Sequence, residues 1–79
     1  MDPTACYNEL LLALRRDDRG EQNEYATSLL RWLERDGFFP VGVPKGDVLD
    51  TLLVTLDPYG NVNSFAKRVA TVRDKLATA

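Results

Sequence analysis

Apolar residues recur at spacings of three and four in four stretches of the 79-residue chain, at about residues 3–18, 21–36, 48–56 and 62–77. Such spacing places them on one face of an α-helix, because each helical residue turns by roughly 100°. The predicted apolar faces are, in chain order, Cys6, Tyr7, Leu10, Leu11 and Leu14; Tyr25, Ala26, Leu29, Leu30, Trp32 and Leu33; Val48, Leu49, Leu52, Leu53 and Leu56; and Phe65, Val69, Val72 and Leu76. We therefore predict an all-α fold, a small four-helix domain spanning residues 1–79.

The short polar stretch DDRG, residues 17–20, joins the first two predicted helices. A link of this kind favours an N-terminal antiparallel helical hairpin, to which two further helices are added. Asp2 and Asp47 are expected to cap the first and third helices. Gly37 is expected to close the second helix in a left-handed conformation, with Phe38 packing back onto its last turn.

The middle of the chain also permits an α+β alternative with a hairpin in residues 38–65. The stretch TLLVTL is rich in residues that favour strands, and DPYGN suits a turn. FFPVGV could add a third strand, which Pro40 would confine to an edge. The helical prediction is preferred because the leucines between 49 and 56 fit a period of 3.6, whereas a period of two divides them between both faces.

The composition removes most catalytic and metal-binding arrangements. The chain has no histidine and one cysteine, Cys6. Zinc sites of the Cys/His type and Ser-His-Asp or Cys-His catalysis are therefore excluded within one chain. Cys6 falls on a predicted apolar face, where cysteines are usually inert. We expect no catalytic residue, no metal and no cofactor, and so a protein that is not an enzyme.

The N-terminal sequence MDPTACYNEL has neither the basic start nor the long apolar run of a secretory signal. No stretch reaches the roughly 20 apolar residues that a membrane span requires. A single cysteine also argues against the disulfide framework typical of short secreted domains. These features predict a cytoplasmic protein with no membrane contact.

Charge is distributed unevenly along the chain. Residues 1–60 carry a net charge of −5, whereas residues 61–79 carry +3. Lys67, Arg68 and Lys75 lie on the predicted solvent side of the last helix, where they could meet phosphates. A small nucleic-acid-binding regulator is thus the alternative function, although such domains usually carry a more pronounced basic patch.

The stretch DGFFPVGVPKG, residues 36–46, carries four large apolar side chains although its glycines and prolines prevent a regular helix. These side chains either close one end of the core or remain exposed for a partner, and exposed apolar patches with aromatic residues mark protein contacts. Leu12 and Val54 are further apolar residues that the predicted core does not need. The candidate partner-binding residues are Phe38, Phe39, Val41, Val43, Leu12 and Val54. We therefore predict a non-enzymatic protein–protein interaction module, or a small domain that associates with itself.

Overall fold

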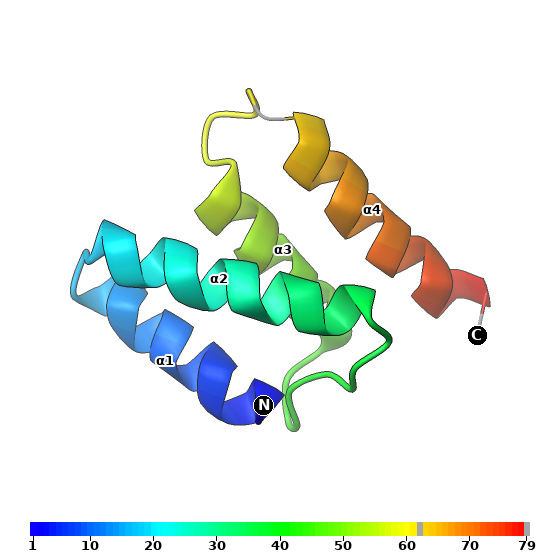
Figure 1. Ribbon diagram of the computed structural model, residues 1–79, viewed down its shortest axis with the longest axis horizontal. Coiled ribbons are helices and arrows are strands. Elements are labelled where there is room, and N and C mark those ends of the chain that lie inside the picture. The colour runs from blue at the N-terminus through cyan, green and yellow to red at the C-terminus, as the bar shows by residue number, and fades with distance from the viewer. Residues whose placement is uncertain (62, 79) are drawn as a thin grey trace.

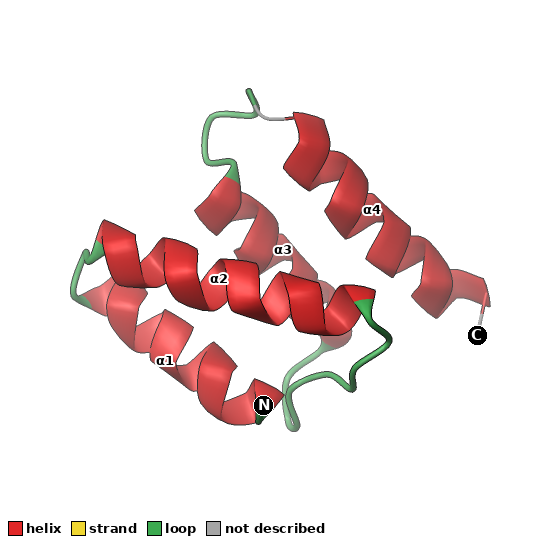
Figure 2. Ribbon diagram, viewed as in Figure 1, coloured by secondary structure: helices red, strands yellow, loops and turns green. Residues whose placement is uncertain are grey.

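The computed structural model describes residues 1–61 and 63–78. Four helices follow one another along the chain: α1, Pro3–Arg15; α2, Arg19–Glu34; α3, Lys45–Leu56; and α4, Asn63–Thr78 (Figure 1). The described residues contain no strand (Figure 2), so the all-α prediction is confirmed and the hairpin alternative is wrong. The leucine-rich stretch 51–56 completes α3, as its 3.6-residue period indicates. The expected start of the fourth helix at Val62 lies outside the described residues.

The first two helices form the predicted antiparallel hairpin (Figure 1). Asp2 caps α1 as expected, because its Oδ1 accepts hydrogen bonds from the backbone N–H groups of Thr4 and Ala5 at 3.0 and 3.3 Å. The link between the helices is shorter than predicted, since α2 already begins at Arg19. Asp18 caps α2 by accepting a hydrogen bond from the Glu21 N–H at 3.1 Å.

Helices α1 and α2 end in the same way, with an aspartate in the left-handed region. Asp17 has φ of 57° and Asp36 has φ of 65°. After α2, the Asp36 N–H donates to the Leu33 carbonyl at 3.1 Å and the Gly37 N–H donates to the Trp32 carbonyl at 3.0 Å. This is the hydrogen-bond pattern of a Schellman motif. The prediction that Gly37 is the left-handed residue is therefore wrong, because the helix ends early enough for Asp36 to take that place.

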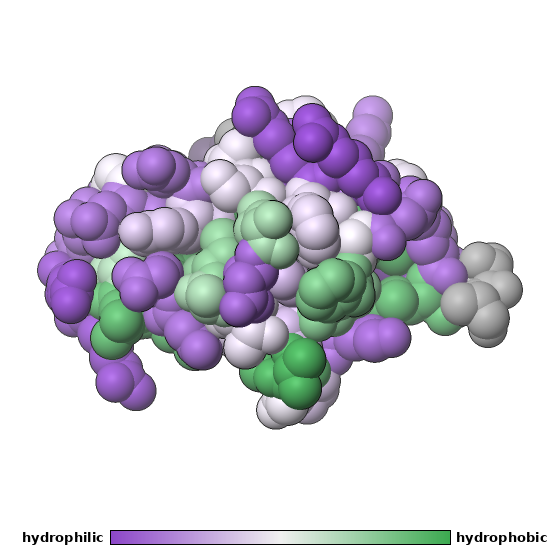
Figure 3. Space-filling model, turned by 60° about the horizontal axis from the view of Figure 1, so that its bottom comes forward, coloured by the Kyte–Doolittle hydropathy of each residue, from purple (hydrophilic) through white to green (hydrophobic). Residues whose placement is uncertain are grey.

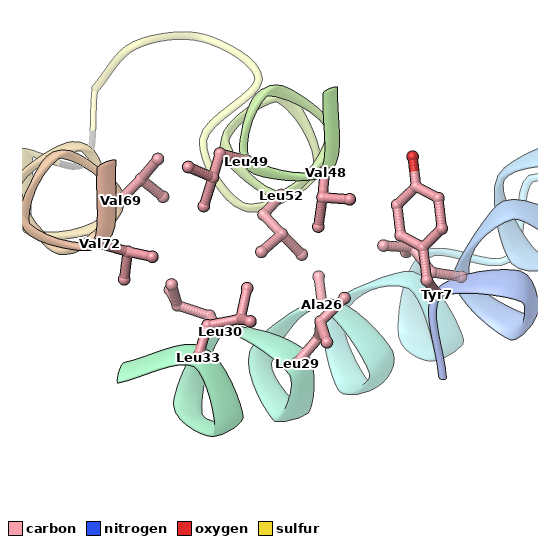
Figure 4. Close-up of a cluster of buried hydrophobic side chains, with 11 residues drawn as sticks. Tyr7, Ala26, Leu29, Leu30, Leu33, Val48, Leu49, Leu52, Val69 and Val72 are labelled. Atoms are coloured by element: carbon pink, nitrogen blue, oxygen red, sulfur yellow. The ribbon is translucent and has the colours of Figure 1, made fainter. Parts of the chain in front are cut away.

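Helix α2 lies at the centre of the core. Its apolar face points at α3 and α4, and Tyr7 reaches the same cluster from α1 (Figure 4). Close packing of helix on helix joins α2 to α1, to α3 and to α4, and joins α3 to α4. The buried apolar residues of this cluster are Tyr7, Leu10, Ala26, Leu29, Leu30, Leu33, Val48, Leu49, Leu52, Val69 and Val72.

Helix α1 buries a narrower face than the sequence predicts. Leu11 and Leu14 are exposed, whereas Ala13 is fully buried. The reason is that α1 packs chiefly against α2, while the pair α1 and α3 is not among the closely packed pairs. Leu14 therefore borders a gap beside α3 instead of filling a core.

Helix α3 begins earlier than predicted, at Lys45, with Pro44 in the capping position. No side chain caps it, so the prediction for Asp47 is wrong. The Pro44 carbonyl accepts hydrogen bonds from the N–H groups of Asp47 and Val48 at 3.0 and 3.2 Å, which places Asp47 inside the first turn. The fixed φ of proline favours this entry into the helix.

We expect Asp17→Gly to raise the free energy of unfolding by roughly 0.5–1 kcal/mol, because glycine adopts positive φ without the steric cost that an L side chain meets. Urea unfolding followed by circular dichroism measures the change. Asp17→Ala is the matched control, since it also removes the carboxylate but keeps a Cβ. Equal stability of the glycine and alanine variants would show that the left-handed backbone at this position carries no strain.

Candidate protein-interaction surface

The apolar side chains of the 36–46 segment differ in their exposure to solvent. Phe38 and Val41 are 64% and 75% exposed. Phe39 and Val43 are half-buried and pack against the core cluster. Pro40 between them is buried. Both alternatives that the sequence left open therefore occur in this segment: two side chains pack on the core and two remain exposed.

Three hydrogen bonds fix the backbone that carries the exposed side chains. One is the Gly37 bond to Trp32 that closes α2. In the second, the Trp32 indole Nε1–H donates to the Phe38 carbonyl at 3.0 Å. In the third, the Val41 N–H donates to Thr4 Oγ1 at 3.0 Å and so ties the segment to the start of α1. Phe38 and Val41 are thus exposed on a backbone that is held in place.

The rings of Trp32 and Phe38 meet edge to face, with centroids 5.7 Å apart and an interplanar angle of 84°. We call this pair the aromatic ridge. Gly37 makes the arrangement possible, because a Cβ at that position would lie 2.4 Å from the Trp32 indole. Residue 37 must therefore lack a side chain because of a close approach, and its φ is not the reason.

Each ring of the aromatic ridge lines a hollow. The first, which we call the lysine pocket, has a volume of about 360 Å³. It is lined by Leu33, Asp36, Gly37, Phe38, Phe39, Lys45, Val72, Lys75 and Leu76. Lys45 Nζ lies 5.5 Å from the centroid of the Phe39 ring. Lys75 Nζ donates to Asp36 Oδ1 at 3.1 Å and to the Glu34 carbonyl at 3.3 Å.

The second hollow, which we call the arginine pocket, has a volume of about 370 Å³. Its lining residues are Met1, Ser28, Arg31, Trp32 and Arg35. Trp32 lines this hollow and Phe38 lines the lysine pocket, so the two hollows are connected through a pair of rings in contact. Apolar groups also form separate patches among hydrophilic residues on the face that Figure 3 displays.

The remaining candidate residues lie elsewhere. Val54 is 66% exposed and lines a hollow of about 300 Å³ between α1 and α3, together with Leu14. Leu12 is exposed on α1 and lines none of the three hollows. The structure therefore does not bring Leu12 and Val54 together with the 36–46 segment.

Sequence reasoning missed the residues that complete the surface. Helical spacing predicts that Trp32 belongs to the core face, and the predicted site residues do not include Lys45, Arg31 or Arg35. A signal was present in the chain: a tryptophan followed by glycine and phenylalanine, five and six residues later, spans the end of a helix. A C-terminal cap brings such positions together across the last turn.

Two of the three basic residues proposed for nucleic-acid binding contact acidic side chains at or just after the end of α2. Arg68 Nε and Nη2 donate to the two carboxylate oxygens of Glu34 at 2.9 and 2.6 Å. These hydrogen bonds lower the pKa of Glu34, while partial burial acts in the opposite direction. Lys75 contacts Asp36 as described above. Lys67 is exposed.

Cys6 is half-buried, and its thiol donates to the Tyr25 carbonyl at an Sγ–O distance of 3.5 Å. Burial raises the pKa of this thiol, which disfavours the reactive thiolate at neutral pH.

Within the described part of the chain, no three His, Cys, Asp or Glu side chains lie close enough together to bind a metal ion. None of the described helices is long and apolar enough to cross a bilayer.

No protein-family model matches this chain, and no match was found among curated proteins or solved structures.

Gly37→Ala is expected to lower the free energy of unfolding by about 1–3 kcal/mol, because the added methyl group would displace the Trp32 ring from its packed position. Urea unfolding followed by the emission of Trp32, the only tryptophan, measures both stability and ring environment. Gly20→Ala is the matched control: its Cβ would lie 3.6 Å from the Asp18 Oδ1 atom, an ordinary contact, and alanine favours a helix. If the two variants unfolded at the same urea concentration, the close approach at Gly37 would be refuted.

The Glu34–Arg68 pair should stabilise the fold by about 1 kcal/mol at neutral pH, since it is bidentate but only partly buried. Because the folded protein has the lower pKa for Glu34, this stability is complete above the ordinary value of 4.5 and is lost as pH falls through the lowered pKa. The stability difference between the wild type and Glu34→Gln should therefore shrink on acidification. Urea titrations at several pH values check this, with Asp50→Gln, which breaks a more exposed pair, as the control. A constant difference at all pH values would contradict the assignment.

Proposed function

We propose that this chain is a non-enzymatic protein-interaction domain that binds a partner protein through Phe38, Val41 and the aromatic ridge. The observation that carries the proposal is the exposure of Phe38 and Val41 on a backbone fixed by hydrogen bonds to Trp32 and Thr4. Exposing an aromatic ring and a branched aliphatic side chain to water is unfavourable. A small domain has only a small core, and these two side chains do not contribute to it. A partner that covers them would regain that free energy.

The anchored backbone also supports binding. A segment already held in one conformation loses little conformational entropy when a partner binds, so more of the contact energy appears as affinity. Tryptophan is among the residues most enriched at the centres of interfaces. Trp32 lies beside Phe38 and is itself only partly buried. The surface thus combines a pair of aromatic rings with a hollow beside each ring.

The partner is another protein rather than a second copy of this chain. A two-fold dimer would bring the same patch to both sides of its interface. The cations that border the aromatic ridge, Lys45, Arg31 and Arg35, would then lie in one interface with the same three cations of the second copy. Repulsion between like charges opposes that arrangement.

We do not propose the nucleic-acid alternative, because Arg68 contacts the carboxylate of Glu34 at the end of α2 and Lys75 contacts that of Asp36 just after it. Phosphates would have to compete with those carboxylates for both side chains. Catalysis is not proposed either: the chain lacks histidine, and the lysine pocket is mainly apolar.

The proposal is tested with peptides selected from a random displayed library on the immobilised chain. Synthetic forms of the selected peptides should shift the emission of Trp32 and should bind Phe38→Ser/Val41→Ser at least tenfold more weakly, a loss of about 1.4 kcal/mol. Val54→Ser, which removes an equally exposed side chain from a different hollow, is the control and should bind as the wild type does. Circular dichroism verifies that both variants remain folded.

Peptides that bind the double variant as tightly as the wild type would refute this surface. Sedimentation of the chain alone gives a second check, with a monomer expected across the accessible concentration range. A dimer that dissociates in Phe38→Ser/Val41→Ser would instead assign the same surface to self-association.

A further inference from the structure

The charge around the aromatic ridge is opposite to that of the whole chain. The chain has a formal net charge of −2, yet the charged side chains that line the two pockets are four cations and one anion. The cations are Lys45 and Lys75 on one side and Arg31 and Arg35 on the other. The anion is Asp36, and Lys75 already donates a hydrogen bond to it.

Three of these cations are available to an incoming group. Lys45, Arg31 and Arg35 form no salt bridge within residues 1–61 and 63–78. Lys45 lies over the Phe39 ring at a cation–π distance, which keeps its charge next to the apolar wall of the lysine pocket. Arg31 lies in the last turn of α2 and Arg35 is the residue that caps its C-terminus, and both line the arginine pocket.

The two pockets are similar in size, and each is lined by one of the two rings of the aromatic ridge, the lysine pocket by Phe38 and the arginine pocket by Trp32. Their volumes, about 360 and 370 Å³, lie at the lower end of the roughly 300–1,000 Å³ range of ligand sites. A hollow of that size takes one large side chain more readily than an extended cofactor. A chain segment crossing the ridge could place an apolar side chain in each hollow and an anionic group near the cations on each side.

We infer that the partner presents an acidic amphipathic segment, in which apolar side chains enter the two pockets and carboxylates pair with Lys45 on one side and with Arg31 and Arg35 on the other. This inference rests on the proposed function and specifies the partner's chemistry. A neutral segment would remove water from these cations without replacing it by an ionic contact, which is costly. A basic segment would be repelled.

The test uses three synthetic 12-residue peptide pools with the same leucine and phenylalanine positions and no tryptophan. The remaining positions hold Glu and Asp in the first pool, Gln and Asn in the second, and Lys and Arg in the third. Titration into the full chain, followed by Trp32 emission, should show the acidic pool binding at least tenfold more tightly than the neutral pool at low ionic strength. The difference should shrink as salt is added, because exposed charges are screened.

Charge variants test the pairing directly. Lys45→Glu and Arg35→Gln should each weaken binding of the acidic pool by about tenfold or more, while binding of the neutral pool should change little. Lys45→Glu should fold normally, because a negative charge is favourable at the first position of α3. Lys67→Glu, the same substitution at an exposed position of α4 that lines neither pocket, is the matched control and should leave binding of the acidic pool unchanged.

Phe38→Ala separates this inference from the proposed function. If the neutral and acidic pools bound equally well and both required Phe38, the acidic partner would be refuted and the interaction surface would stand. If no pool bound, or if all pools bound regardless of Phe38, both proposals would fail. Preference for the acidic pool that is lost in Lys45→Glu and kept in Lys67→Glu would establish the inference.

Discussion

Burial of one face of α2 is the interaction on which the rest of this structure depends. Leu29 and Leu30 are fully enclosed, and Leu33 nearly so. The other three helices pack against this helix, whereas α1 and α3 do not pack closely against each other. Each fully buried leucine contributes about 1.5–3 kcal/mol relative to an exposed one. The central position of α2 therefore sets where every other element can lie.

The C-terminal turn of α2 also organises the surface. Its residues close the helix, hold the backbone of Phe38 and supply the acidic partners of α4. The uneven charge along the chain corresponds to ion pairs between α4 and the preceding part of the fold. Basic residues of α4 pair with acidic residues of earlier elements, Arg68 with Glu34 and Arg73 with Asp50. The excess of positive charge in residues 61–79 thus complements part of the negative excess that precedes it.

Helical periodicity was sufficient to predict the four helices and the inward faces of α2, α3 and α4, because each of those helices packs against more than one neighbour. It failed for Leu11 and Leu14, since the exposure of a helical face depends on which neighbour covers it, and α1 is covered mainly by α2. The exposure of Phe38 and the half-burial of Phe39 could not be predicted either. In an irregular segment the direction of each side chain depends on long-range hydrogen bonds, such as that from Val41 to Thr4. The local pattern of apolar residues does not reveal such bonds.

In the short link between α1 and α2, Asp18 takes part in the ends of both helices. Asp18 donates its backbone N–H to Ala13 at the end of one helix, while its carboxylate accepts the Glu21 N–H at the start of the next. One residue thus terminates one helix and initiates another. If a residue were inserted at this point, Asp18 could keep only one of these two hydrogen bonds. The angle between α1 and α2 would then change. The length of this connection should therefore vary less in evolution than its composition.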